Sequence, residues 1–289
     1  MTQVVRPRPL SRLWHHGPAA VTAAAVSLLL LHAPQEGTTK GALLAVGALQ
    51  LALVLAWPIA LVFRGYVGAA LIGAGAAAAA DFVVLRNDGE SNPLVADGAD
   101  PSAADSGLGA LAAVLALACV LAFVHQLTRR PPRRDVTDSL AGDSMLVLAV
   151  VAASTYLVLF QLTDGPALLD MCVAAIGAAV VTGHLVDLVV PYPRIVDGVP
   201  RGLLGFVLGT GAAMLAAMHR GEADGLVEQL GTLILGGVLG GLACLVAIGA
   251  SYAATERPGS LIAQTAVQAV LPFALAAPVA YFMSILVGG

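Results

Sequence analysis

The sequence predicts an all-α, polytopic transmembrane helical bundle of about nine helices. Of its 289 residues, 58% are hydrophobic and only 11% are charged, and the mean hydropathy is +0.89. A soluble domain has about 25% charged residues, so this chain lacks the polar side chains that coat a surface in water. Its apolar residues also gather into nine runs that approach the roughly 20 residues needed to cross a bilayer.

The nine runs follow one another along the chain and are separated by short polar segments. None of these segments is long enough for a soluble catalytic or nucleotide-binding domain. We expect residues 1–17 to form a cytoplasmic N-terminal segment and residues 18–289 a single transmembrane domain. The first run follows three arginines and therefore also resembles a signal peptide. The predicted spans are 18–33, 41–63, 66–85, 107–127, 144–162, 166–190, 202–218, 230–252 and 264–287.

The basic residues fall mostly in alternate loops. Eleven of the 14 Lys and Arg residues precede the first run or lie in every second loop after it. The positive-inside rule predicts a cytoplasmic N-terminus and an external C-terminus in a bacterial cytoplasmic (inner) membrane. The acidic loop at about 86–106 is then external, and the basic loop at about 128–142 is cytoplasmic. Arginines of the basic loop would attract anionic lipid headgroups: Arg129, Arg130, Arg133 and Arg134.

Ionisable side chains inside the predicted spans are candidates for function, because burying a charge in lipid is costly. Asp81 lies toward the external half of the third span, and Asp170 and Asp187 lie near the two ends of the sixth. His184 precedes Asp187 by three residues, so both share one face of a helix. Such a pair can transfer a proton, bind a cation or serve as a structural contact. His125, near the cytoplasmic end of the fourth span, is the fifth candidate.

No residue pattern predicts a cofactor or a metal centre. His125 and His184 could face each other, but no second histidine pair completes a haem or metal site. Cys119, Cys172 and Cys244 lie in apolar runs without CxxC spacing, which is typical of small buried side chains. The chain has no nucleotide-binding, metalloprotease or hydrolase motif, and a net charge of −4 is too small to indicate a nucleic-acid partner.

Glycines at i,i+4 spacing predict close packing of the seventh and eighth spans. This small-xxx-small pattern lets helix backbones approach each other, either within the chain or across a homodimer. Prolines at 58, 272 and 278 are expected to kink the second and ninth spans. Gln264 and Gln268 are expected to hydrogen-bond a neighbouring helix or to line a pathway. The glycine pattern is carried by Gly205, Gly209, Gly236, Gly237, Gly240 and Gly241.

The second half of the chain resembles the CDP-diacylglycerol synthase (phosphatidate cytidylyltransferase) family in layout. The resemblance rests on Val181-Thr-Gly-His-Leu185, Pro193-Arg-Ile195, Gly202-Leu-Leu-Gly205 and Ala276-Ala-Pro-Val-Ala-Tyr281. In that family the first segment begins with an aspartate, the second continues through paired lysines and a glutamate, and further aspartates precede the last helix. All of these are missing here. Because the acids would hold the metal ions for phosphoryl transfer, the resemblance implies a catalytically degenerate relative.

Three classes of function stay open, and the sequence leans away from an enzyme. The first is a non-catalytic helix-packing subunit or envelope-associated scaffold, with a homo-oligomeric or membrane-protein partner. The second is a proton-coupled or small-solute transporter or channel that uses the intramembrane Asp and His side chains. The third is the degenerate lipid enzyme. A single lysine, with abundant alanine and glycine, is typical of a high-GC bacterium such as an actinobacterium.

Overall fold

The described part of the chain is all-α, and nine of its helical stretches are long and apolar enough to cross a membrane. This confirms the predicted fold class and the predicted number of spans. The computed structural model describes residues 12–32, 39–62, 65–86, 107–129, 135–162, 164–190, 192–195, 199–221, 225–256 and 259–288. The helices are α1 (Arg12–His32), α2 (Thr39–Leu61), α3 (Tyr66–Arg86), α5 (Leu108–Thr128), α6 (Val136–Ala153), α7 (Thr155–Phe160), α8 (Gly165–Val189), α9 (Leu203–Arg220), α10 (Leu226–Glu256) and α11 (Leu261–Gly288).

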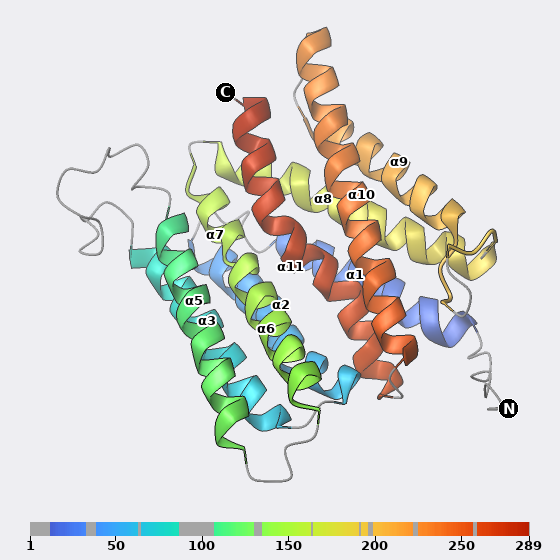
Figure 1. Cartoon of the computed structure of the whole chain (residues 1–289). Coiled ribbons are helices and arrows are strands. Elements are labelled where there is room, and N and C mark those ends of the chain that lie inside the picture. Colours follow the sequence, from blue (N-terminus) through green and yellow to red (C-terminus); the bar gives the residue numbers. More distant parts are fainter. Residues whose placement is uncertain are drawn as a thin grey trace, which may run out of the picture.

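The helices form two groups that are joined by α11 (Figure 1). The first helix group consists of α1, α8, α9 and α10, and the second consists of α2, α3, α5, α6 and α7. α11 lies between the groups and contacts members of both, including α10 and α1 on one side and α2 and α6 on the other. Together α6 and α7 make one span, Val136–Phe160, which is interrupted by a turn at Ser154.

Small side chains allow α11 to occupy the centre of the bundle. Ala274 and Ala277 of α11 are fully buried, as is the neighbouring Phe273. The Phe273 carbonyl accepts a hydrogen bond from the hydroxyl of Tyr156 in α7 at 2.9 Å. Close approach of this kind replaces the hydrophobic effect as the source of helix association in lipid.

Three helices begin at least four residues earlier than the apolar runs predict. α1 begins at Arg12, α6 at Val136 and α10 at Leu226, each four to eight residues before the predicted span. A helix continues through polar residues that reach a protein partner or the lipid–water boundary, so an apolar run underestimates its length. The extension brings two adjacent histidines into α1 and Asp143 into α6.

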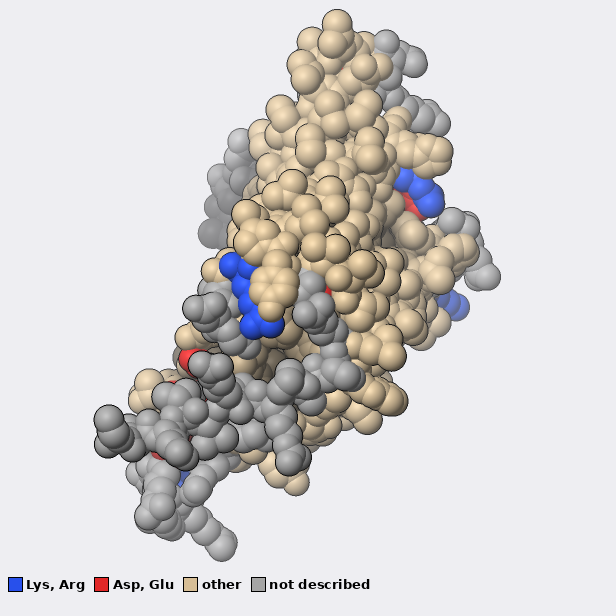
Figure 2. Space-filling model, turned by 90° about the vertical axis from the view of Figure 1, so that its right-hand side faces the viewer, with Lys and Arg blue, Asp and Glu red and all other residues tan. Residues whose placement is uncertain are grey.

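The outer surface is apolar. Figure 2 shows that the described part of one face carries few charged side chains. Leu44, Leu71 and Leu215 are each about 70% exposed, being 72%, 69% and 70% accessible. A soluble monomer rarely leaves a large contiguous apolar surface open to water, whereas lipid acyl chains suit such a surface. The surface and the helix lengths agree on a multi-pass membrane protein.

Candidate functional site

The C-terminal part of α8 carries two buried ionisable side chains on one face. His184 is 0% exposed and Asp187 is 2% exposed, and both belong to a helix suited to crossing a membrane. They are three positions apart, so both project from the side of α8 on which other helices pack. Burying such groups is costly unless hydrogen bonds and opposite charges offset the loss of water.

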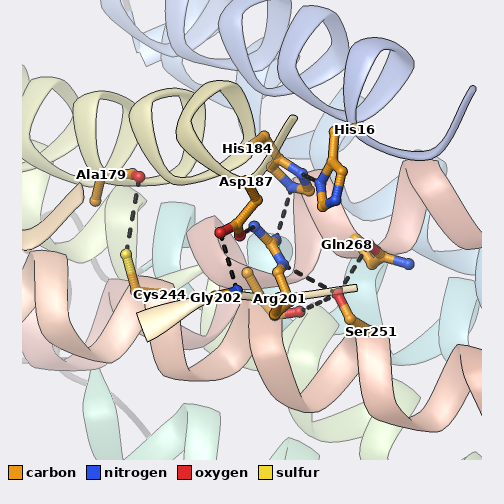
Figure 3. A network of polar contacts seen from close by, with 10 residues as sticks. His16, Ala179, His184, Asp187, Arg201, Gly202, Cys244, Ser251 and Gln268 are labelled. Carbon is orange, nitrogen blue, oxygen red and sulfur yellow. Dashed lines mark hydrogen bonds and ion pairs between the residues drawn. The ribbon is translucent and has the colours of Figure 1, made fainter. Parts of the chain in front are cut away.

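Arg201, in the segment between α8 and α9, contacts both side chains. Its Nη1 donates to Asp187 Oδ2 at 3.2 Å, and its Nη2 donates to His184 Nε2 at 2.8 Å. Its Nε donates to the hydroxyl of Ser251 in α10 at 3.1 Å. Figure 3 shows these side chains converging on the guanidinium. Arg201 is itself buried, so it forms a buried ion pair with Asp187.

Two opposing effects act on the charge of Arg201. Burial lowers the pKa of Arg201, and the nearby Asp187 carboxylate raises it. Arginine begins from so high a value that it stays protonated in proteins. Asp187 Oδ1 accepts the backbone N–H of Gly202 at 2.9 Å, so both carboxylate oxygens are hydrogen-bonded. Buried opposite charges persist only with such complete hydrogen bonding.

A local turn and a glycine allow this ion pair to form. Arg194 and Gly202 make an isolated antiparallel bridge, which folds the segment between α8 and α9 back on itself. Arg201 directly precedes the bridged Gly202 and points toward α8 (Figure 3). In α9, a Cβ at Gly205 would overlap the Asp187 carboxylate. The absence of a side chain at Gly205 therefore gives Asp187 its space.

The contacts of Arg201 determine which nitrogen of His184 carries the proton. A guanidinium only donates hydrogen bonds, so Nε2 of His184 accepts and Nδ1 carries the proton. His184 Nδ1 lies 3.3 Å from Nδ1 of His16 in α1, and His16 Nδ1 is therefore the acceptor. His184 and His16 are both neutral in this arrangement. His15 lies next to His16, with ring centroids 4.9 Å apart.

These contacts extend to α11. The Ser251 hydroxyl lies 2.9 Å from Gln268 Oε1 and 2.8 Å from the Ala247 carbonyl. Side chains from α1, α8, α10 and α11 and from the segment before α9 are thus connected by hydrogen bonds. We call this set the arginine network: His16, His184, Asp187, Arg201, Ser251 and Gln268.

A small cavity adjoins the arginine network. It offers the centre of a water molecule about 10 Å³, and its lining includes Asp187, Arg201 and Cys244. This is the minimum space that holds one water molecule. Most of the other lining residues are apolar, such as Ala247 and Phe206. In this conformation the cavity has room for one water molecule, and a larger solute would have to open it.

Asp81 lies in the second helix group and has neutral partners. The Ser154 hydroxyl donates to Asp81 Oδ1 at 2.7 Å, and Gln50 Nε2 donates to the same oxygen at 3.0 Å. Gln50 also donates to the Val150 carbonyl at 3.1 Å. Ser154 is the turn residue between α6 and α7, and all three polar side chains are buried. We call Asp81, Gln50 and Ser154 the amide network.

The other two candidates lie away from both networks. Asp170, near the opposite end of α8 from Asp187, pairs with Arg220 of α9 at 2.7 Å. A helix rise of 1.5 Å per residue separates the two α8 carboxylates by about 25 Å. His125 of α5 packs on α3, with its Nε2 3.3 Å from the Gly65 carbonyl. The structure thus brings together only the two predicted residues at the C-terminal end of α8.

Several buried polar residues are missed by the sequence reasoning. Asp143 of α6 is 1% exposed and accepts a hydrogen bond from Gln126 of α5 at 2.6 Å. It directly precedes the predicted fifth span, so the apolar run assigns it to a loop. Arg201 counts as a loop charge for the same reason, and His16 falls in the predicted N-terminal segment. Their position within two helical turns of an apolar run is the signal that could have found them.

Four of the six predicted glycines lie at close helix contacts. A Cβ at Gly209 would come within 2.7 Å of the Ala179 carbonyl of α8, and one at Gly236 within 2.8 Å of the Ala213 carbonyl of α9. α9 therefore packs through its own glycines on α8 and receives the glycines of α10 on its other side. The four glycines are Gly205, Gly209, Gly236 and Gly240.

The other two glycines face away from such contacts. A Cβ at Gly241 would meet no heavy atom of the described chain within 4 Å, and one at Gly237 would make only an ordinary contact with Met214 at 3.7 Å. Among the described residues, this small-xxx-small pair on α10 therefore makes no close helix contact.

Part of the predicted basic loop can be placed. Arg129 is half-buried, and its Nη1 donates to Gln126 Oε1 at 2.6 Å and to the Ser139 hydroxyl at 3.3 Å. Its guanidinium thus contributes to the contact between α5 and α6. Three further predicted arginines, and residues 87–106 of the acidic loop, lie outside the described residues: Arg130, Arg133 and Arg134.

Within the described ranges, no group of three or more His, Cys, Asp or Glu side chains is arranged to hold a metal ion. Cys119, Cys172 and Cys244 are free thiols. His125 and His184 lie in different helix groups.

Three of the four segments that resemble the CDP-diacylglycerol synthase family lie at the arginine network or next to it. The first holds His184, the second is bridged through Arg194 to Gly202, and the third begins at Gly202. The fourth lies within α11. Comparison of the chain with protein-family models, with curated proteins and with solved structures finds no match in any of the three.

Proposed function

We propose that the protein is a non-catalytic membrane protein, a helix-packing subunit or an envelope-associated scaffold of a bacterial cytoplasmic membrane. The observation that supports this proposal is the separation of the intramembrane carboxylates. Asp81, Asp170 and Asp187 have three different sets of partners, all from the chain itself. A transport path needs polar groups that succeed one another across the membrane, whereas these groups lie in different helix groups or about 25 Å apart.

The outward glycine pair on α10 supports a role in assembly. Gly237 and Gly241 have the spacing that brings membrane helices together, yet they make no close contact in the described chain. A second copy of the chain or another membrane protein could pack there at backbone distance.

Cysteine cross-linking in the membrane tests the assembly role. We expect Gly241→Cys to form a disulfide-linked dimer, or an adduct with a partner, under mild oxidation. Gly47→Cys on α2 is the matched control, since its position also has no heavy atom within 4 Å in the described structure. The mass of the protein in mild detergent provides a second measurement. A monomer with no partner and no cross-link at Gly241 would contradict the proposal.

The proposed orientation has a cytoplasmic N-terminus and an external C-terminus. It is supported by the basic residues near the bundle end that holds the arginine network, including Arg129, Arg194 and Arg201. Alkaline phosphatase fused after Gly289 should be active, because that enzyme needs the oxidising exterior. Activity of a fusion in the loop after α5, and inactivity of the C-terminal fusion, would reverse the orientation.

A proton-coupled or small-solute transporter is the second candidate. It is favoured by the ion pair of Asp187 and Arg201 beside a cavity with room for one water molecule. In this case Asp187→Asn should abolish solute- or proton-dependent flux in proteoliposomes, with Asp170→Asn as the matched control on the same helix. Flux that persists in the folded Asp187→Asn protein would remove this candidate.

A further inference from the structure

We propose that Arg194, in the segment between α8 and α9, binds the phosphate of an anionic phospholipid, and that this end of the bundle lies in the lipid headgroup layer. The inference goes beyond both candidate functions and does not depend on either. It rests on where the exposed aromatic side chains lie, on the opposite directions of two arginines in one segment, and on the apolar surface around the outward arginine.

The exposed tryptophan and tyrosine side chains lie near one particular end of their helices. The chain has 2 Trp and 5 Tyr, and all seven belong to the described residues. Three of them are buried, and the other four are 46–65% exposed. The exposed four lie near the start of α1 and of α3, just after α8, and near the end of α10: Trp14, Tyr66, Tyr192 and Tyr252.

These helix ends belong to the same end of the bundle. The start of α1 and the C-terminal parts of α8 and α10 meet in the arginine network. A Cβ at Gly259, between α10 and α11, would overlap the Ala60 carbonyl near the end of α2, which places the connection from α2 to α3 there as well. Trp and Tyr concentrate at the boundary between lipid and water. This end of the bundle is therefore the one with aromatic anchors in the headgroup layer.

The segment between α8 and α9 directs its two described arginines to opposite sides. Backbone hydrogen bonds of 2.8 and 3.2 Å flank the bridge between Arg194 and Gly202. Successive residues of an extended strand point to opposite faces, so Arg194, which pairs with Gly202, points away from the side of Arg201. The exposures agree, because Arg201 is buried and Arg194 is exposed. One arginine thus stabilises the bundle and the other faces outward.

The outward guanidinium is held in place by an aromatic ring. The guanidinium carbon of Arg194 lies 5.2 Å from the centre of the Tyr192 ring. Stacking on an aromatic face restrains an arginine and leaves the N–H groups in the guanidinium plane available. Arg194 forms no ion pair with any residue that the structure describes. A phosphate group can accept two parallel hydrogen bonds from such a guanidinium.

The surface around Arg194 is apolar, which favours a lipid over a water-soluble anion. Four apolar side chains close to Arg194 or to its bridge partner in the sequence are 40–73% exposed: Val189, Val190, Ile195 and Leu203. A free anion would leave these side chains in water, whereas a phospholipid covers them with its glycerol backbone and acyl chains. The positive charge then favours a lipid with a net negative headgroup over a zwitterionic one.

Quenching of an introduced tryptophan by brominated lipids tests the proposal on the full chain in bilayers. Tyr192→Trp places the reporter beside Arg194 and keeps an aromatic ring there. Trp14→Phe in the same chain removes the natural exposed tryptophan, and Trp57 is buried. Brominated phosphatidylglycerol and brominated phosphatidylcholine are compared, each mixed with unbrominated phosphatidylcholine. We expect phosphatidylglycerol to be favoured about fivefold at this site, the effect of one arginine at a charged lipid surface.

Two further variants assign the preference to Arg194. Arg194→Gln in the reporter chain should abolish the preference, so that the two lipids quench equally. Phe82→Trp is the matched control, since Arg86 lies over that ring at 5.9 Å, near the opposite end of α3 from Tyr66. We expect no preference for phosphatidylglycerol there, because five acidic residues between positions 88 and 105 follow Arg86 and repel an anionic headgroup.

Three results would overturn the proposal. The first is equal quenching by both lipids at Tyr192→Trp, and the second is a preference that persists in Arg194→Gln or is as strong at Phe82→Trp. The third is no quenching by either lipid, which would mean that protein or water covers this segment. Where the reporter chain does not fold, native mass spectrometry with added phosphatidylglycerol compares Arg194→Gln with Arg86→Gln. Only Arg194→Gln should bind the lipid more weakly than the natural chain, and unchanged binding would contradict the assignment.

Discussion

The two helix groups bury a carboxylate in opposite ways. In the first group, Asp187 meets the guanidinium of Arg201 and a backbone N–H. In the second group, Asp81 meets only the neutral donors Gln50 and Ser154. Both carboxylates are nearly inaccessible, so the difference lies in the partners and not in the burial.

The comparison teaches that one residue type serves two electrostatic purposes in this bundle. Asp187 balances a buried cation, and its negative charge is therefore required. The bonds from Gln50 and Ser154 to Asp81 both end on Oδ1, so they survive when the other oxygen holds a proton or is replaced by an amide. Removal of the carboxylate charge should therefore lower stability strongly at Asp187 in the first helix group and only slightly at Asp81 in the second.

The largest expected effect is that of Asp187→Asn. This change leaves Arg201 as an unbalanced buried charge, which costs about 3–5 kcal/mol of unfolding free energy. Asp81→Asn is the same chemical change in the second group, keeps an oxygen at the Oδ1 position, and should cost about 1 kcal/mol or less. Reversible unfolding in mixed micelles measures both. Equal losses in the two variants would remove the contrast between the groups.

A double variant sharpens the comparison further. Replacement of a whole buried ion pair by apolar side chains is often neutral, whereas loss of one partner is not. We expect Asp187→Leu with Arg201→Met to recover most of the stability that either single change loses. The same unfolding measurement, arranged as a double-mutant cycle, gives the coupling. Additive losses would mean that the two residues act independently.

An intermediate effect is expected where glycines separate the helices. Gly209→Val would push its side chain onto the Ala179 carbonyl and should cost about 1–3 kcal/mol through overpacking. Gly241→Val has open space in the described structure and should change monomer stability by less than about 1 kcal/mol. The unfolding temperatures of the two variants are compared in excess detergent, where the protein is dilute enough to be monomeric. A strong loss for Gly241→Val under those conditions would show a contact within the monomer.

The smallest effect concerns a neutral hydrogen bond in the second group. Trp57 Nε1 donates to the Gly142 carbonyl at 3.0 Å, next to the buried Asp143. Trp57→Phe keeps most of the ring and loses this bond, which should cost about 1 kcal/mol. Thermal unfolding followed by circular dichroism is the measurement. A loss of unfolding free energy as large as that of Asp187→Asn would contradict the expected difference between the two helix groups.

The sequence predicted the number and class of the helices because a segment that crosses lipid must be apolar and about 20 residues long, and such runs are visible in the sequence. It also placed His184 and Asp187 on one face, since a spacing of three residues specifies a helix face. Helix ends were less predictable. A helix that extends past its apolar run, as α1 and α6 do, carries polar residues that composition alone assigns to loops.

The partners within each network could not be predicted for a different reason. Arg201 and Ser251 lie in separate segments, and His16 is 168 residues from His184, so their contacts depend on how helices are arranged. Gln50 and Ser154 are neutral residues inside apolar runs, where charge gives no signal. Spacing specifies neighbours along one helix, whereas contacts between helices require the three-dimensional packing.

The spacing of the Arg201–Asp187 pair along the chain also bears on how the protein enters the membrane. The two residues are only 14 positions apart, so α8 and α9 can be inserted as a hairpin that already carries its neutralising charges. His16 emerges from the ribosome long before this hairpin, and Gln268 emerges after it. We therefore expect biosynthesis to proceed from a self-contained central hairpin. His16 can contact it as soon as α8 is in place, Ser251 joins with α10, and only the contact of Gln268 waits for the final helix.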